Sequence, residues 1–195
     1  MKKFAGISVF AIALSAGLAA QGQAPSQPPA QPSSSPQSPR PTGSAGMSQG
    51  TLASTDTSFI TTAGASGKAE VALATLAQQK ASNDRVRQYA TKLHGDHQKA
   101  NSELTALAAK KKVTIPDIPA DKKAVHDRLS GQSGAEFDRA YMTQMVQDHK
   151  ASVSLFTTAS SSSDADVKAF AEKTLPTLKI HLSDAEAILK ELGSR

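Results

Sequence analysis

The sequence has no cysteine and no tryptophan, and it contains only two tyrosines and six phenylalanines among 195 residues. Without cysteine the protein has no disulfide, no lipid-modified cysteine at its amino terminus and no thiol nucleophile. Beyond residue 20 no apolar run is long enough to cross a membrane. No segment after residue 50 alternates between apolar and polar residues in the manner of a strand. These absences favour a helical fold with a core made mostly of aliphatic side chains.

The first 50 residues differ in composition from the rest of the chain. Lys2 and Lys3 precede an almost uncharged stretch at 4–20 that ends in small residues, which is typical of a secretory signal peptide. An uncleaved anchor helix is the alternative, but about 17 residues are at the short limit for spanning a bilayer. Seven of the ten prolines lie at 21–50, where too little apolar surface is available to offset the entropy of ordering the chain.

We therefore predict a signal peptide at 1–20, a disordered linker rich in Pro, Ser and Gln at 21–54, and a helical domain at 55–193. The protein is expected to be exported to the periplasm or cell envelope, with no transmembrane segment after signal cleavage. The formal net charge is +5, but the chain beyond residue 50 holds 19 Lys and Arg against 17 Asp and Glu. This near balance gives no basis for nucleic-acid binding. Oligomeric state and association with an envelope layer stay open.

Apolar residues in the domain recur at steps of three and four, the spacing of amphipathic helices. This spacing predicts four long helices at about 56–82, 84–112, 135–161 and 164–192. The connection at 113–134 carries two prolines and a short helix near 120–129. It is long enough to return from one end of the bundle to the other, so the expected fold class is all-α, a ferritin-like four-helix bundle. Gly64 and Gly67 either weaken the first helix or allow a neighbour to approach closely.

Four polar residues interrupt the apolar faces of the long helices: Glu70, His97, His149 and His181. A polar group buried without a partner costs about 2 kcal/mol or more, so such positions need an explanation. With the crossover connection each of the four lies 11 to 14 residues from the same end of the bundle. At about 1.5 Å per residue, their heights differ by only about 5 Å. We therefore expect the four side chains to meet in the core.

One carboxylate and three imidazoles can hold a single Zn, Cu, Mn or Fe ion, in a closed tetrahedral site or with one position open to water. We predict Glu70, His97, His149 and His181 as the ligands, and no catalytic residue. Four further residues are predicted to orient the imidazoles from adjacent helices: His94, Asp96, Asp148 and Asp184. Di-iron bundles instead use a Glu-x-x-His motif on two helices, and the chain lacks that motif at these positions.

Several motifs resemble a known family. They include Asp96-His97, the run Met145-Val146-Gln147-Asp148-His149, and Leu175-Pro176 followed by His181-Leu182. The pattern is similar to the family called domain of unknown function 4142 (DUF4142), over residues 55–190. The resemblance implies an exported bacterial protein with a ferritin-like bundle, and it supplies no activity. The segment Leu93-His94-Gly95 departs from the family pattern, which more often has Met-Val ahead of the first Asp-His.

The leading hypothesis is an exported bundle that binds a transition metal and serves metal handling or envelope stress. The alternative is a non-catalytic structural or interaction module, in which the buried polar network holds no ion and fixes the register of the helices. A third alternative gives the four residues separate, unconnected roles. A redox enzyme that uses the bound ion is the least favoured of the functional hypotheses.

Overall fold

The computed structural model describes residues 51–193, so the predicted signal peptide and most of the predicted linker lie outside the described residues. Within that range there are five helices and no strand. The helices are α1 (Ser54–Lys80), α2 (Asp84–Lys111), α3 (Ala120–Ser130), α4 (Gly134–Ala159) and α5 (Ala165–Gly193). The predicted helix boundaries agree with these to within two residues. The all-α fold predicted from apolar spacing is confirmed.

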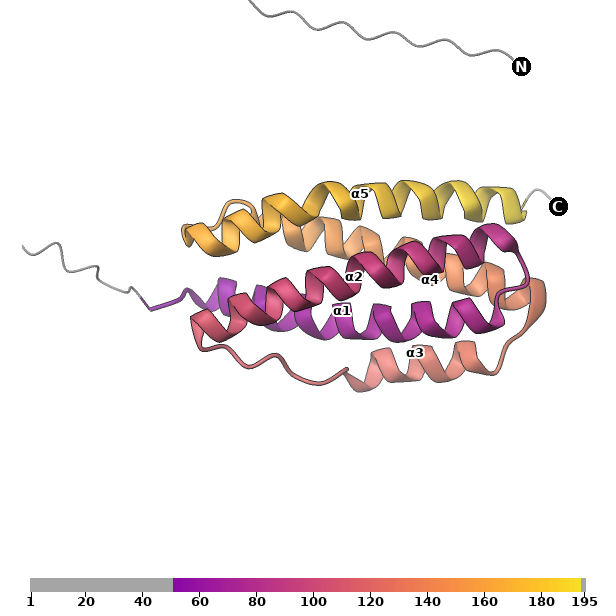
Figure 1. Ribbon diagram of the computed structural model, residues 1–195, viewed down its shortest axis with the longest axis horizontal. Coiled ribbons are helices and arrows are strands. Elements are labelled where there is room, and N and C mark those ends of the chain that lie inside the picture. The colour runs from indigo at the N-terminus through magenta and orange to yellow at the C-terminus, as the bar shows by residue number, and fades with distance from the viewer. Residues whose placement is uncertain (1–50, 194–195) are drawn as a thin grey trace, which may run out of the picture. The chain divides into compact units, whose positions relative to one another are not determined.

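The four long helices form two antiparallel hairpins, α1–α2 and α4–α5 (Figure 1). They pack so that α1 contacts α4 and α2 contacts α5. The connection between the hairpins returns along the outside of α1 and carries α3, which contacts α1 and α4. As a result α2 and α4 run in the same direction (Figure 1), which is the crossover arrangement of ferritin-like bundles.

The returning chain is held in place by Asp138, near the start of α4. Its buried carboxylate accepts hydrogen bonds from the backbone N–H groups of Ser82 (3.1 Å) and Asn83 (2.9 Å), and from the Ser82 hydroxyl. Asn83 is also the residue whose side chain caps the amino terminus of α2. At the same end of the bundle Arg139 donates to the carbonyl of Leu192 at 2.8 Å. The start of α4 is thus tied both to the α1–α2 turn and to the end of α5.

Two apolar clusters fill the bundle, one toward each end. The cluster near the α1–α2 turn includes Leu73, Leu93, Phe137, Met145 and Ile188. The cluster toward the other end includes Phe59, Ile60, Leu104, Phe156 and Phe170. In the second cluster three phenylalanine rings contact one another at centroid distances of 5.0 to 6.3 Å. On every long helix the predicted ligand lies between residues of the first cluster and residues of the second.

Gly64 and Gly67 lie where α1 is approached closely by its neighbours. A Cβ atom at Gly64 would clash with Ile115 of the connection, and one at Gly67 would clash with Asn101 of α2. Of the two roles predicted for these glycines, close approach is the one that the packing requires.

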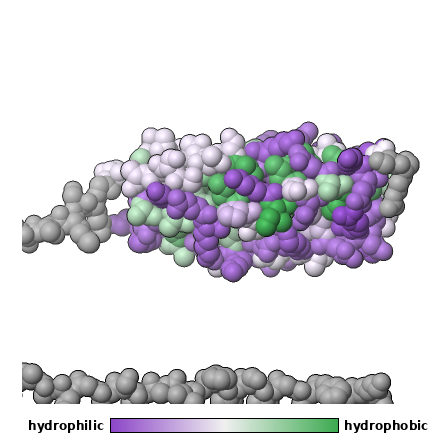
Figure 2. All heavy atoms as spheres, turned by 90° about the horizontal axis from the view of Figure 1, so that it is seen from above, coloured by the Kyte–Doolittle hydropathy of each residue, from purple (hydrophilic) through white to green (hydrophobic). Residues whose placement is uncertain are grey.

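The outside of the bundle is largely polar. Figure 2 shows a face on which hydrophilic residues surround smaller apolar areas. In residues 51–193 Ile180 is the only large apolar side chain that is mostly exposed, at 52%. None of the described helices combines the length and the apolar character that crossing a bilayer requires.

Replacing Asp138 by Ala should lower the free energy of unfolding by about 2–4 kcal/mol, because three donors lose a buried, charged acceptor. The matched control is Asp121→Ala, in the exposed first turn of α3, where we expect a change below about 1 kcal/mol. Urea unfolding followed by circular dichroism measures both. Equal effects of the two substitutions would show that Asp138 does not hold the hairpins together.

Candidate metal centre

The structure brings the four predicted ligands together at the middle of the bundle, one from each long helix. Glu70 comes from α1, His97 from α2, His149 from α4 and His181 from α5, and all four are buried. The three imidazole rings have centroid separations of 5.4 to 5.6 Å. One ligating atom from each histidine lies within 4.8 Å of the other two. The cluster therefore draws on residues that are up to 111 positions apart in the sequence.

Glu70 lies on the side of the cluster formed by His97 and His149. Its Oε2 atom is 3.0 Å from His97 Nε2 and 3.6 Å from His149 Nε2. These distances suit an ion pair with a protonated imidazole, and they also suit two ligands of one ion. A tetrahedral site with bonds of about 2.0–2.1 Å has ligand atoms about 3.3 Å apart. The imidazoles would have to move inward by about 1 Å to reach that separation.

Two hydrogen bonds fix the tautomers of His149 and His181. His149 Nδ1 lies 3.0 Å from the carbonyl oxygen of Met145, which can only accept, so Nδ1 carries the proton. His181 Nε2 lies 2.9 Å from Asp96 Oδ2, so this nitrogen donates to the carboxylate. The lone pairs of neutral His149 and His181 are therefore on Nε2 and Nδ1 respectively. Orienting an imidazole through its other nitrogen is how proteins usually position histidine ligands.

Four buried atoms in the cluster have no hydrogen-bond partner within residues 51–193: Glu70 Oε2, His97 Nε2, His149 Nε2 and His181 Nδ1. The close approach of Glu70 to His97 does not have hydrogen-bond geometry, although it is short enough for charge attraction. Each buried polar atom without a partner costs about 1–3 kcal/mol. Four of them at one place, with apolar clusters on both sides, is an arrangement that an added ligand would stabilise.

Burial and charge set the protonation states of the cluster. Burial raises the pKa of Glu70, but the charges of His97 and His149 outweigh it and lower that pKa to about 2. Burial lowers the pKa of His97, but the carboxylate of Glu70 outweighs it and the net pKa is raised. Burial lowers the pKa of His181 to about 4, against the hydrogen bond to Asp96. At neutral pH Glu70 is ionised and His181 is neutral, whereas His97 holds a proton more readily than a free imidazole does.

Of the four residues predicted to orient the imidazoles, Asp96 contacts one and the others do not. Asp148 forms a buried ion pair with Lys122 of α3 and accepts a hydrogen bond from Gln144 at 3.2 Å. Asp184 pairs with Lys92 at 3.4 Å. Each of these two carboxylates is paired with a lysine and does not contact an imidazole, so the orienting role expected of them stays a prediction.

His94 is the fourth of these residues, and it is half-buried on α2. Within the described part of the chain it makes no hydrogen bond or ion pair, so the orienting role predicted for it is also not seen.

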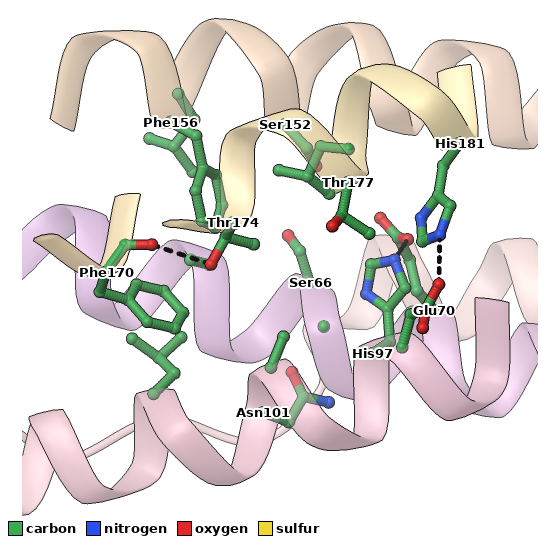
Figure 3. Close-up of a pocket in the computed structure, with 17 residues that line it drawn as sticks. Ser66, Glu70, His97, Asn101, Ser152, Phe156, Phe170, Thr174, Thr177 and His181 are labelled. Carbon is green, nitrogen blue, oxygen red and sulfur yellow. Dashed lines mark hydrogen bonds and ion pairs between the residues drawn. The ribbon is translucent and has the colours of Figure 1, made fainter. Parts of the chain in front are cut away.

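Sequence reasoning missed a pocket that adjoins the cluster (Figure 3). Glu70, His97 and His181 line one end of it, and Phe156 and Phe170 lie at the other end. Its volume of about 40 Å³ is enough for a few water molecules. Five small polar residues also line it, and four of them lie three or four residues from a ligand: Ser66, Asn101, Ser152 and Thr177. Their spacing of three or four residues from the ligands was the available signal, and it shows only once the direction of every helix is known.

A family model matches the chain over residues 41–188, and its description is domain of unknown function (DUF4142). No curated protein matches the chain. Several solved structures share the fold at low sequence identity. A DUF305 fragment from Deinococcus radiodurans has a TM-score of 0.65 at 13% identity, over 72% of this chain and 98% of that one.

A secreted DUF305 protein from Streptomyces coelicolor has a TM-score of 0.62 at 13% identity, over 71% of this chain and 92% of that one. CopM in its Cu(I)-bound form has a TM-score of 0.60 at 18% identity, over 70% and 96%. At such identities these likenesses concern the fold alone. Because the family model covers most of the chain, including three long helices, most of α5 and all four residues of the cluster, this protein belongs to the DUF4142 family.

Proposed function

We propose that this protein binds one transition metal ion at the centre of the bundle. The ligands are His97 Nε2, His149 Nε2, His181 Nδ1 and the carboxylate of Glu70. The observation that carries the proposal is a set of four buried atoms without hydrogen-bond partners: three imidazole nitrogens of a histidine group whose ligating atoms lie within 4.8 Å of one another, and Glu70 Oε2, which lies 3.0 Å from His97 Nε2. A single ion would satisfy all four at once, whereas hydrogen bonds among three imidazoles and one carboxylate leave lone pairs unmatched.

The donor set favours copper and zinc over the other candidate ions. Imidazole nitrogen suits Zn, Cu and Fe, and carboxylate oxygen also suits Mn. For a given set of nitrogen and oxygen ligands, divalent affinity rises from Mn through Fe to Cu and falls again at Zn. The similarity of the fold to a protein solved with Cu(I) supports copper among these ions.

The proposed role is metal handling or envelope stress in an exported protein. The secreted protein among the structural neighbours supports export, together with the signal-peptide pattern at residues 1–20. A metal-free polar centre in a structural or interaction module is the second candidate. It is favoured by the 3.0 Å approach of Glu70 to His97, which gives the pair electrostatic stabilisation without an ion.

The first test is metal binding by protein purified without a histidine tag. After exposure to Cu, Zn, Mn and Fe, we expect one equivalent of metal by elemental analysis and a raised melting temperature. Binding at 100 times the dissociation constant stabilises the folded state by about 2.7 kcal/mol. His149→Ala should abolish the stabilisation by metal, because it removes one of the proposed ligands from a fully buried position.

The matched control is His126→Ala. His126 lies on α3 with a side chain that is 39% exposed, 3.5 Å from Asp127, and it is outside the cluster. This variant should bind metal as the wild type does. A wild-type protein that takes up none of the four metals would contradict the metal centre and leave the metal-free module. If His126→Ala loses metal binding and His149→Ala keeps it, the ion binds near His126 and not at the cluster.

Zinc affinity should depend on pH through His97. Because Glu70 raises the pKa of His97, the free protein holds a proton on this ligand that the ion must displace. Below the pKa of His97 the apparent affinity should fall about tenfold for each unit of pH, and above it the dependence should flatten. His181 does not compete, since its pKa is lowered to about 4.

Competition titrations with a zinc chelator between about pH 6 and 8 measure this dependence. Glu70→Gln removes the cause of the raised pKa, so its steep region should move to lower pH while the overall affinity drops. Parallel pH profiles for the wild type and Glu70→Gln would show that Glu70 does not control the proton on His97.

A further inference from the structure

Four polar residues form a ring one helical turn from the cluster, all on the same side of it. Ser66 lies four residues before Glu70, Asn101 four after His97, Ser152 three after His149 and Thr177 four before His181. Given the directions of the helices, each of these steps leads away from the α1–α2 turn. The ring is therefore a second polar layer, contributed by all four long helices, between the cluster and the phenylalanines.

No member of this ring is satisfied by the protein itself. Within residues 51–193 the side chains of Ser66, Asn101, Ser152 and Thr177 make no hydrogen bond. Many other threonines in the helices donate to the carbonyl four residues earlier, as Thr174 does to Phe170 at 2.8 Å. Thr177 is in the same helix as Thr174 and lacks such a bond. Figure 3 shows Ser66, Asn101 and Thr177 pointing into the pocket.

The opposite side of the cluster is closed and apolar. One turn toward the α1–α2 turn the helices carry Leu73, Leu93, Met145 and Ala185, all of which are buried. His149 has no exposed surface and does not line the pocket, whereas Glu70, His97 and His181 do. Glu70, His97 and His181 thus line the end of the pocket nearest the cluster, and their atoms without hydrogen-bond partners lie just behind its wall. A further ligand can reach a bound ion only from this side.

Charge indicates what kind of ligand this would be. A divalent ion beside the ionised carboxylate of Glu70 leaves one positive charge among the ligands, because neutral imidazoles add none. The other carboxylate that lines the pocket, Asp96, is partly exposed and already accepts a hydrogen bond from His181. An uncompensated charge away from water is unfavourable, so a monovalent anion stabilises it most simply. The pocket provides donors for the far end of such an anion from Ser66, Asn101 and Thr177. Its volume of about 40 Å³ limits the anion to a few atoms.

We propose that the pocket binds a small monovalent anion as an additional ligand of the metal ion, with Ser66, Asn101, Ser152 and Thr177 holding its distal end. The inference rests on the proposed function, since the anion binds to the ion as well as to the ring. An anion site of this kind would make the metal centre an open one that exchanges ligands, in contrast to a closed structural site.

The test uses the protein loaded with Cu(II) and sodium azide as the probe. Azide has three atoms, one negative charge and a charge-transfer band when it binds copper. We expect a saturable band on titration, and an accompanying change in the electron paramagnetic resonance spectrum. The copper content is measured first, on the same sample.

Filling the pocket should remove azide without removing copper. Ser152→Leu places an isobutyl group in the pocket from α4, and Ser154→Leu is the matched control at an exposed position of the same helix. We expect Ser152→Leu to weaken azide binding at least about tenfold, while copper affinity stays within about threefold. Ser154→Leu should change neither.

A second pair of variants leaves the shape of the pocket unchanged. Thr177→Val removes an unpaired hydroxyl and should weaken azide binding at least about tenfold, the effect of one hydrogen bond to a charged group. Thr174 also lines the pocket, but its hydroxyl already donates to the carbonyl of Phe170. Thr174→Val should therefore retain the azide affinity of the wild type. This pair keeps the test decisive if Ser152→Leu does not fold.

The outcomes separate the two proposals. If the wild type binds no copper, zinc, manganese or iron, the metal centre and the anion site are both overturned. If copper binds but azide produces no band, or if Thr177→Val and Ser152→Leu bind azide as tightly as their controls, the anion site is overturned and the metal centre stands.

Discussion

The central constraint on this structure is that four lone pairs are buried at one point, between two apolar clusters, without hydrogen-bond partners. Bundles of this size are normally stabilised by the apolar faces of their helices. Here each long helix carries a polar residue near its middle, and the cluster near the α1–α2 turn closes one side of these four residues with apolar side chains. A ligand shared by Glu70, His97, His149 and His181 removes the penalty at all four positions together.

The crossover topology is what brings these positions to one level. If the second hairpin ran in the opposite sense, His181 would be displaced by about one turn, roughly 5 Å. The carboxylate of Asp138 holds the returning chain beside the α1–α2 turn and so sets the height of α4. Lys122 of α3 reaches Asp148, next to His149, and ties the crossover connection to the same helix. Features far from the cluster therefore determine its geometry.

Much of the fold and the composition of the cluster could be predicted from the sequence, because both depend on periodicity along single helices. The spacing of apolar residues located the helices, and Glu70 and the three histidines were recognisable as polar residues on apolar faces. The partners of Asp148 and Asp184 could not be predicted, since they depend on how neighbouring helices are rotated about their axes. The pocket was missed for a related reason. Thr177 and Ser66 are ordinary helical residues until the relative directions of α5 and α1 are known.

The protonation states suggest how the centre tolerates both the presence and the absence of an ion. Without metal, a proton on His97 compensates the carboxylate of Glu70, and the pKa shifts of the two groups are those of a coupled pair. In the proposed metal-bound state a divalent ion would replace that proton and bring one more positive charge than it removes. Leu93 and Met145 on the apolar side carry no charge, so balancing charge would come from the pocket side, where Asp96 lies and where we propose the anion. The asymmetry between Leu93 and Met145 on one side and Asn101 and Thr177 on the other then has a single electrostatic explanation.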